Sequence, residues 1–304
     1  MAQIAAADFN AIRSKVISVI GPGSGTLGYG QAIQSSAITP GTVISATQYD
    51  NLRFDIVNIK IHQDGVSPFI RDINKGDVIR SQAGDPKVQY DNLANVCIQN
   101  KFNISTGQYA LNARTSQVRG TAWSSQVSCV VTVTFANAND ARYFFNSGGK
   151  VRFTSTRTGG AATNQNSSWT SLLTAAGTQS FGAINDSPLV NYYSLTSSYQ
   201  QFYIKLASSS YASNNYTIEA KCDVASNSGG TARIIDFRIK WTDAYIDPDT
   251  LNPLPSHPSF APTDTVDGSL TLSVEELKAT GALIPFGAFT VTSPSYSITS
   301  ISGS

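Results

Sequence analysis

The chain has 304 residues, of which 21 are Lys or Arg and 20 are Asp or Glu, so its formal net charge is +1. Charged residues make up 13% of the chain, well below the roughly 25% of average globular proteins. A nucleic-acid-binding protein is expected to carry a basic excess or a basic stripe, and we expect no nucleic-acid partner here. Because 41% of the residues are hydrophobic and 10% are aromatic, the chain can bury a core.

Targeting and redox signals are sparse. The first residues lack a basic segment followed by an apolar run, so we expect no signal peptide and synthesis in a cytoplasm. No stretch approaches the roughly 18 apolar residues of a membrane span, and no membrane insertion is expected. Three widely spaced cysteines, Cys97, Cys129 and Cys222, predict small buried side chains rather than a disulfide framework or a zinc site.

Residues 1–112 are predicted to form a helical N-terminal assembly domain. Apolar residues at helical spacing follow Asp8, a suitable cap, and the run stops at a Gly-Pro pair after Ile20. A second helix is expected to begin at Thr47 and to end at Gly65. A third begins at Asp85, because a capping residue followed by proline suits the first turn of a helix.

From about residue 113 the hydrophobic period changes to two, which indicates half-buried strands. The expected strands, separated by clusters of Gly, Asn and Ser, cover residues 127–135, 150–157, 202–206, 216–224 and 232–241. Short helices are expected over residues 138–145 and 167–176. The predicted fold is therefore mainly β, with a helical N-terminal part followed by an antiparallel β-sandwich over residues 113–245.

Residues 246–304 are predicted to be a proline-rich linker and an extended C-terminal arm. Five prolines lie between residues 248 and 262, a density typical of an extended segment. The residues beyond them alternate polar and apolar but are too few for a core of their own. The arm is therefore expected to pack on the sandwich or on a neighbouring copy, with Phe286 and Phe289 as candidate contact residues.

The motifs that would indicate catalysis or cofactor binding are weak. Gly23, Gly25 and Gly28 match the spacing of a dinucleotide-binding turn, but that turn needs a strand before it and a long helix after it. The two histidines, His62 and His257, have no Cys or carboxylate neighbours at the spacing of metal ligands, and no Gly-x-Ser-x-Gly elbow occurs. We expect no enzyme activity, no cofactor and no metal.

Residues 142–149 form the most distinctive run. Phe144 and Phe145 lead into Asn146 and a Ser-Gly-Gly turn, after which the chain restarts as a strand. The glycines permit the positive φ angles that such a turn requires. We expect an ordered hinge here, with Phe144 or Phe145 buried.

This run and two others together resemble virion structural proteins of tailed bacteriophages, and are most similar to those of contractile-tailed phages related to the T4-like cyanophages. The other runs are Gly-Tyr-Gly-Gln at residues 28–31 and His-Gln-Asp-Gly at residues 62–65, and the likeness covers roughly residues 1–160. The resemblance implies a structural virion component that oligomerises in the tail, baseplate or neck, with copies of itself and other virion proteins as partners. The candidate assembly or interface residues are Tyr29, Gln31, His62, Gln63, Phe144, Phe145, Asn146, Phe286 and Phe289.

The alternative is a receptor- or glycan-binding tail-fibre module. In that role Trp123, Trp169 and Trp241 would stack on sugars of the host surface, whereas their other interpretation is packing in the core or at an interface. A hydrolase of host-surface glycans is a weaker third hypothesis. Saturable glycan binding would favour the fibre module, and release of sugars would favour the hydrolase.

Overall fold

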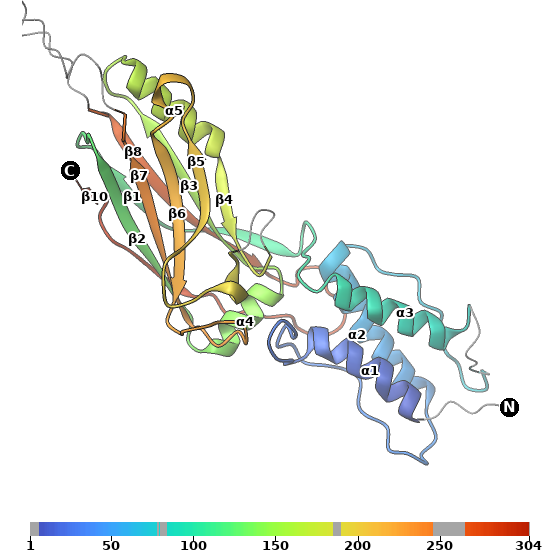
Figure 1. Cartoon of the computed structure of the whole chain (residues 1–304). Coiled ribbons are helices and arrows are strands. Elements are labelled where there is room, and N and C mark those ends of the chain that lie inside the picture. The colour runs from blue at the N-terminus through green and yellow to red at the C-terminus, as the bar shows by residue number, and fades with distance from the viewer. Residues whose placement is uncertain (1–5, 78, 80–83, 185–189, 246–264, 304) are drawn as a thin grey trace, which may run out of the picture.

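The structure is a computed structural model that describes residues 6–77, 79, 84–184, 190–245 and 265–303. Three helices form the N-terminal region: α1 (Ala6–Ile20), α2 (Ala46–Asp64) and α3 (Pro86–Gln99). Figure 1 shows these helices packed together at one end of the molecule and the β-strands at the other. None of the helices in the described ranges combines the length and the apolar character needed to cross a membrane.

The expected ends of the helices and the start of the third are found, but the first two helices begin earlier than predicted: Asp8 lies inside α1, and Ser45 rather than Thr47 caps α2. The side chain of Ser45 caps α2 and forms a reciprocal pair with Gln48, and Gly65 ends the helix with a φ of 77°. Pro86 occupies the first turn of α3 directly after Asp85. The three expected helices are confirmed, because caps, prolines and the period of 3.6 act within a few residues of one another.

The strands form two antiparallel sheets, and neither is closed. The four-stranded sheet has the order β1 (Tyr109–Arg119), β8 (Ser269–Ala279), β3 (Lys150–Thr158) and β4 (Thr178–Phe181). The six-stranded sheet has the path β10 (Ser302–Gly303), β2 (Gln126–Thr134), β7 (Ile234–Thr242), β6 (Asn215–Cys222) and β5 (Gln200–Leu206), with β9 (Ser295–Ile298) also paired to β2. The chain is thus a mixed α/β protein rather than a mainly β one.

Short helices connect several strands. Both expected ones are present: α4 (Ala138–Asn146) and α5 (Asn164–Ala176). The latter begins earlier than predicted because the side chain of Thr163 caps it by accepting a hydrogen bond from the Asn166 amide. Two single 3₁₀ turns, η1 (Tyr192–Ser194) and η2 (Ser209–Tyr211), lie in the connections on either side of β5.

The core follows the alternation of the strands. Every second residue of β2, from Val127 to Val133, is buried. Aromatic rings of the two sheets contact each other: the centroids of Phe153 and Phe237 are 4.8 Å apart, and those of Phe181 and Phe202 are 5.4 Å apart. All three cysteines are buried and unpaired, as predicted.

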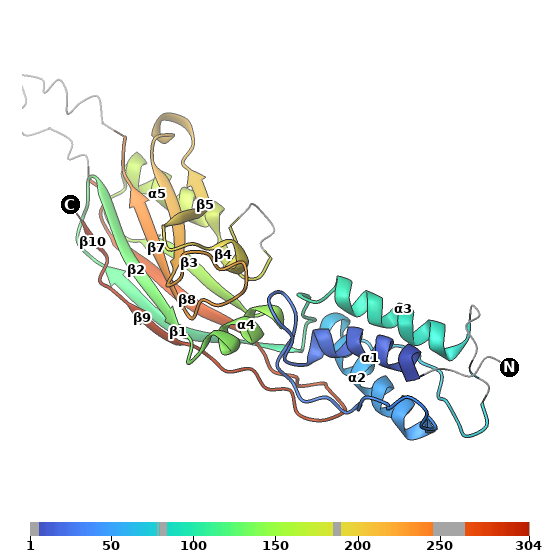
Figure 2. The same cartoon turned by 60° about the horizontal axis from the view of Figure 1, so that its bottom comes forward.

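Residues 265–303 do not form an extended arm, but they pack on the sheets of the chain itself, which is one of the two expected places. Strand β8 lies in the middle of the four-stranded sheet, hydrogen-bonded to β1 on one side and to β3 on the other. Figures 1 and 2 show the chain then running to the helices and turning back beside β2 to its end. Alternate β8 side chains, among them Leu270 and Leu272, complete the chain's own core. The proline-rich residues 246–264 lie outside the described residues.

Candidate functional site

Most of the candidate residues meet where the helices join the sheets. We call this region the junction; it consists of the loop 21–31 after α1, the end of α2, α4 with the turn 147–149, and the segment 281–291. The glycines of the loop follow a helix rather than a strand, so the structural context of a dinucleotide-binding turn is missing. The junction therefore has to be interpreted from its own contacts.

Three rings form the centre of the junction. Tyr29 lies with its ring centroid 5.0 Å from that of His62, and His62 stacks on Phe289 at 4.7 Å with an interplanar angle of 20°. The Tyr29 hydroxyl donates to the Lys101 carbonyl at 2.6 Å and accepts from the Gln63 amide at 3.0 Å. Burial raises the pKa of Tyr29 far above its usual value, so its hydroxyl stays protonated and remains a donor.

The imidazole of His62 is fully buried at the last turn of α2. Its Nε2 lies 3.0 Å from the carbonyl oxygen of Ser147, whereas Nδ1 has no hydrogen-bond partner among the described residues. Burial lowers the pKa of His62 to about 4, and the hydrogen bond to Ser147 opposes this shift only in part. Near neutral pH the ring is therefore uncharged and donates its Nε2 proton to the hinge after α4.

Two side-chain amides form hydrogen bonds between the N-terminal region and the C-terminal segment. Gln31 donates from Nε2 to the Thr290 carbonyl at 2.9 Å and accepts from the Thr290 amide at 2.7 Å. Asn58 makes the same double contact with the backbone of Phe286, at 2.5 and 3.3 Å. The ring of Phe286 also stacks on Phe54 at 4.0 Å. Each amide thus satisfies both backbone polar groups of one residue in an irregular segment.

The hinge run 142–149 contacts the loop after α1. The Asn146 side chain donates to the carbonyls of Gly25 and Gly28, and Arg142 donates to the Leu27 carbonyl at 2.7 Å. Gly30 has a φ of 70°, and a Cβ at this position would lie 2.3 Å from the ring of Tyr143. Only glycine fits there, so this loop can approach α4 closely.

The hinge itself is as expected. Phe144 and Phe145 are both fully buried, and Gly148 has the positive φ, 85°, that the turn requires. Their rings cross at 89° with centroids 5.0 Å apart, and each also contacts Phe135, the residue after β2. The prediction of an ordered, buried hinge is confirmed.

The structure thus places the candidate interface residues inside the chain. Phe286 is half-buried; the buried ones are Tyr29, Gln31, His62, Gln63, Phe144, Phe145, Asn146 and Phe289. Their side chains connect the helices, the hinge and the C-terminal segment, and a role in contacts between copies stays a prediction. A cavity of about 130 Å³ lies beside the hinge, lined by Phe102, Phe145, Lys150 and neighbouring residues.

The three tryptophans that would stack on sugars are also buried. Trp123, Trp169 and Trp241 expose at most 2% of their surface, so their rings pack in the core. The indole N–H of Trp169 donates to the buried carboxylate of Asp243 at 3.2 Å. Their burial supports the packing interpretation rather than the sugar-binding one.

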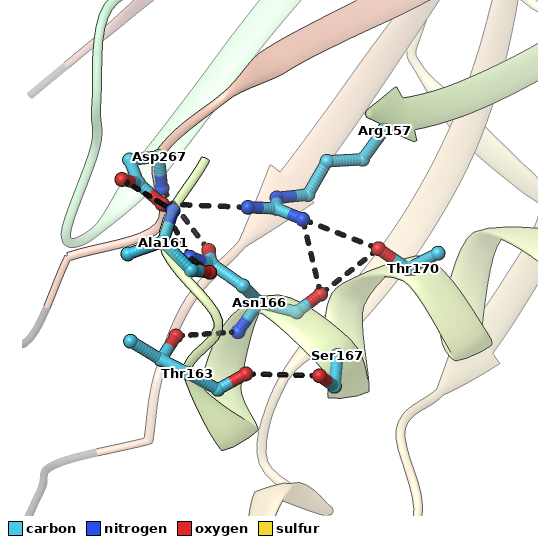
Figure 3. A network of polar contacts seen from close by, with 7 residues as sticks. All are labelled: Arg157, Ala161, Thr163, Asn166, Ser167, Thr170 and Asp267. Atoms are coloured by element: carbon cyan, nitrogen blue, oxygen red, sulfur yellow. Dashed lines mark hydrogen bonds and ion pairs between the residues drawn. The ribbon is translucent and has the colours of Figure 1, made fainter. Parts of the chain in front are cut away.

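A second polar network lies at the start of α5, at the end of the sheets away from the helices (Figure 3). Asp267 accepts from the Ala161 amide, from the Asn166 side chain and from Arg157, whose side chain is 3% exposed. Arg157 also donates to Thr170 and to the Asn166 carbonyl. The hydrogen bond from Ala161, more than any other contact, lowers the pKa of Asp267. The network joins β3, α5 and the residues before β8.

Sequence analysis missed one buried ion pair. Glu276 of β8 is fully buried, and its carboxylate accepts from Arg114 of β1 at 2.6 and 3.1 Å. Ser293 and Tyr296 donate to the same carboxylate at 3.0 and 3.1 Å, which ties β9 and the residues before it to β8. The sequence contained a signal for the burial of Glu276, because this residue continues the inward-facing alternation of Leu272 and Val274.

Among the residues that the structure describes, no group of three or more His, Cys, Asp or Glu side chains is placed to hold a metal ion. Compared with known proteins, the chain matches no protein-family model, no curated protein and no solved structure. Function is therefore inferred from the residues and contacts described above.

Proposed function

We propose that the chain is a structural component of a tailed-phage virion that oligomerises in the tail, baseplate or neck. The observation that carries the proposal is the convergence of the three runs that resemble phage virion proteins. The run 28–31 contacts the run 142–149 through Gly30 and Tyr143, and His62 of the third run reaches Ser147. The three runs are far apart in the sequence but contact one another in one junction. Their joint resemblance to virion proteins is therefore more specific than that of three short motifs without contacts.

The same proposal includes the finer architecture. The two sheets pack face to face as a β-sandwich, which the ring contacts of Phe153 with Phe237 and of Phe181 with Phe202 support. The helical region is held to this sandwich by the junction. A body built in this way suits a building block that is repeated many times in a symmetric particle.

The buried polar groups support a structural role rather than a catalytic one. His62, Arg157 and Glu276 each contact segments far apart in the sequence. Their hydrogen bonds hold elements in place, and the proposed role includes no catalytic step, cofactor or metal. Its partners are copies of the same chain and other virion proteins, and its location is the virion.

The test is to find the chain in purified particles. Mass spectrometry of density-purified virions is expected to detect it at a stoichiometry of several copies per particle. Labelling with gold-conjugated antibody should then place it on the tail, baseplate or neck. Absence from purified particles would contradict the proposal, and saturable binding of the purified chain to host glycans would favour the fibre module instead.

A further inference from the structure

The free edge of β1 is the feature of the surface that the proposed function does not use. Strand β1 is an outermost strand of the four-stranded sheet, and among the described residues it pairs with β8 alone. It has 11 residues, none of them buried, and contains neither proline nor lysine. Proteins usually protect long strand edges with proline, charged side chains or bulges, because an open edge is a template for another strand. The charged side chains of β1 are Arg114 and Arg119, which donate to Ser293, Ile301 and Gly303 of the same chain.

Two exposed apolar side chains lie on this strand. Leu111 is 51% exposed and Val118 is 55% exposed. They are seven positions apart, so in a regular strand they would point to opposite faces of the sheet. The register with β8 shifts between Ala113 and Thr115, which is a β-bulge. The bulge therefore brings Leu111 and Val118 to the same face.

The partners on β8 identify that face. Leu111 lies opposite Leu277 and Val118 lies opposite Thr271, six positions apart and so on one side of β8. The residues between them in the alternation, such as Leu272 and Val274, are buried. Leu111 and Val118 thus point to the outer face of the sheet, away from the core.

The outer-facing residues of β1 form a symmetric set. They include Leu111, Ala113, Ser116 and Val118, which are arranged evenly about the point between Arg114 and Thr115. If two copies of β1 run antiparallel about a two-fold axis at that point, each outer-facing residue lies opposite another outer-facing residue. The two-fold axis then places Leu111 of each copy opposite Val118 of the other.

The same register avoids like charges. The two arginines of β1, Arg114 and Arg119, lie opposite Thr115 and Ala110 of the second copy. Apolar pairs across antiparallel strands stabilise a sheet, and like charges placed opposite each other destabilise it. In this register, β1 is complementary to itself in backbone direction, side-chain face and charge.

We propose that β1 is the contact surface for a second copy of this chain, paired antiparallel about a two-fold axis with Leu111 opposite Val118. The two four-stranded sheets then form one continuous sheet across the contact. The inference rests on the proposed function for the expectation that copies of the chain meet. A two-fold contact closes on itself, so a ring of copies needs a further contact surface.

Cysteine cross-linking tests the register. The variants Leu111→Cys and Val118→Cys are purified separately, mixed and oxidised; the native cysteines are buried and do not interfere. Opposed residues have Cα atoms about 4.5–5.5 Å apart, which suits a disulfide. Two copies of residue 111 would be separated by about 24 Å along the strands. We expect a linked dimer in the mixture and none from either variant alone.

A charge exchange tests the surface without oxidation. Leu111→Lys with Val118→Lys places like charges opposite each other, and we expect loss of the dimer in light scattering after gel filtration. Leu111→Lys with Val118→Glu places opposite charges there, and we expect the dimer to remain. Circular dichroism checks that both doubly substituted chains are folded, since both sites are exposed.

Three results would overturn the inference: a wild-type chain that stays monomeric, a doubly lysine-substituted chain that still dimerises, or a link formed by one cysteine variant alone. The proposed function fails separately. If the chain is found in virions but no link joins residues 111 and 118, the inference fails and the virion role stands. If the link forms but the chain is absent from virions, the virion role fails.

Discussion

Lowering the pH should weaken the fold through the buried imidazole of His62. The pKa of His62 is about 4 in the folded chain, against its ordinary value of 6.5. Between these values the unfolded chain binds a proton that the folded chain does not bind. Stability therefore rises with pH in this window and is lost as the pH falls from about 6.5 towards about 4.

The size of the effect follows from the same two values. The full shift of 6.5 to about 4 corresponds to roughly 3 kcal/mol, reached only at the acid end of the window. Between pH 7 and pH 5 the loss is about 2 kcal/mol. The physical cause is the cost of charging a ring that is stacked on Phe289 and whose Nδ1 has no hydrogen-bond partner in the described part of the chain.

The matched control is His62→Gln, which removes the titrating ring and keeps a donor for the Ser147 carbonyl. Urea unfolding of both chains, followed by circular dichroism at pH 7 and at pH 5, gives the two free energies of unfolding. The carboxylates titrate equally in both chains, so the difference between the two pH dependences isolates His62. We expect the wild type to lose about 2 kcal/mol more than the variant. Equal losses would refute the assignment.

Three further predictions concern packing. A chain ending at residue 247 lacks β8, and we expect it to lose cooperative thermal unfolding; a sharp transition would show that the sheet forms without its middle strand. Glu276→Gln removes the buried carboxylate that pairs with Arg114, and we expect the free energy of unfolding in urea to fall by about 2–3 kcal/mol. Glu275→Gln removes a half-exposed pair and should lower it by less than about 1 kcal/mol. Gly30→Ala should cost about 2 kcal/mol or more from its clash and positive φ, against about 1 kcal/mol for Gly41→Ala, where no atom lies within 4 Å; equal costs would contradict the close approach.

Local signals in the sequence determined most of the secondary structure. The cap at Ser45, the stop at Gly65 and the proline after Asp85 act within one or two turns of a helix, so their effect does not depend on the rest of the fold. The alternation from Val127 to Val133 likewise reports a strand with one buried face. The buried hinge at Phe144 and Phe145 was predicted from another local signal, an aromatic pair followed by a Ser-Gly-Gly turn.

The candidate site was predictable only as a set of residues. Tyr29, His62 and Phe289 come from three distant segments, and no pattern within any one of them says that the rings stack. The buried Glu276 was hidden in the same way, because its inward position has meaning only once Arg114 lies on the neighbouring strand. Sequence analysis proposed Tyr29, His62 and Phe289 for contacts between copies and did not select Glu276; the structure shows the contacts that all four make within one chain.

The partners of the strands were decided by tertiary structure alone. Alternation over residues 270–274 indicates a strand but is the same whether that strand lies at an edge, in the middle of a sheet or on another copy. Its place between β1 and β3 joins residues more than 100 positions apart. The order of the sheets depends on which distant side chains fill the core together, and no segment of the sequence contains that information by itself.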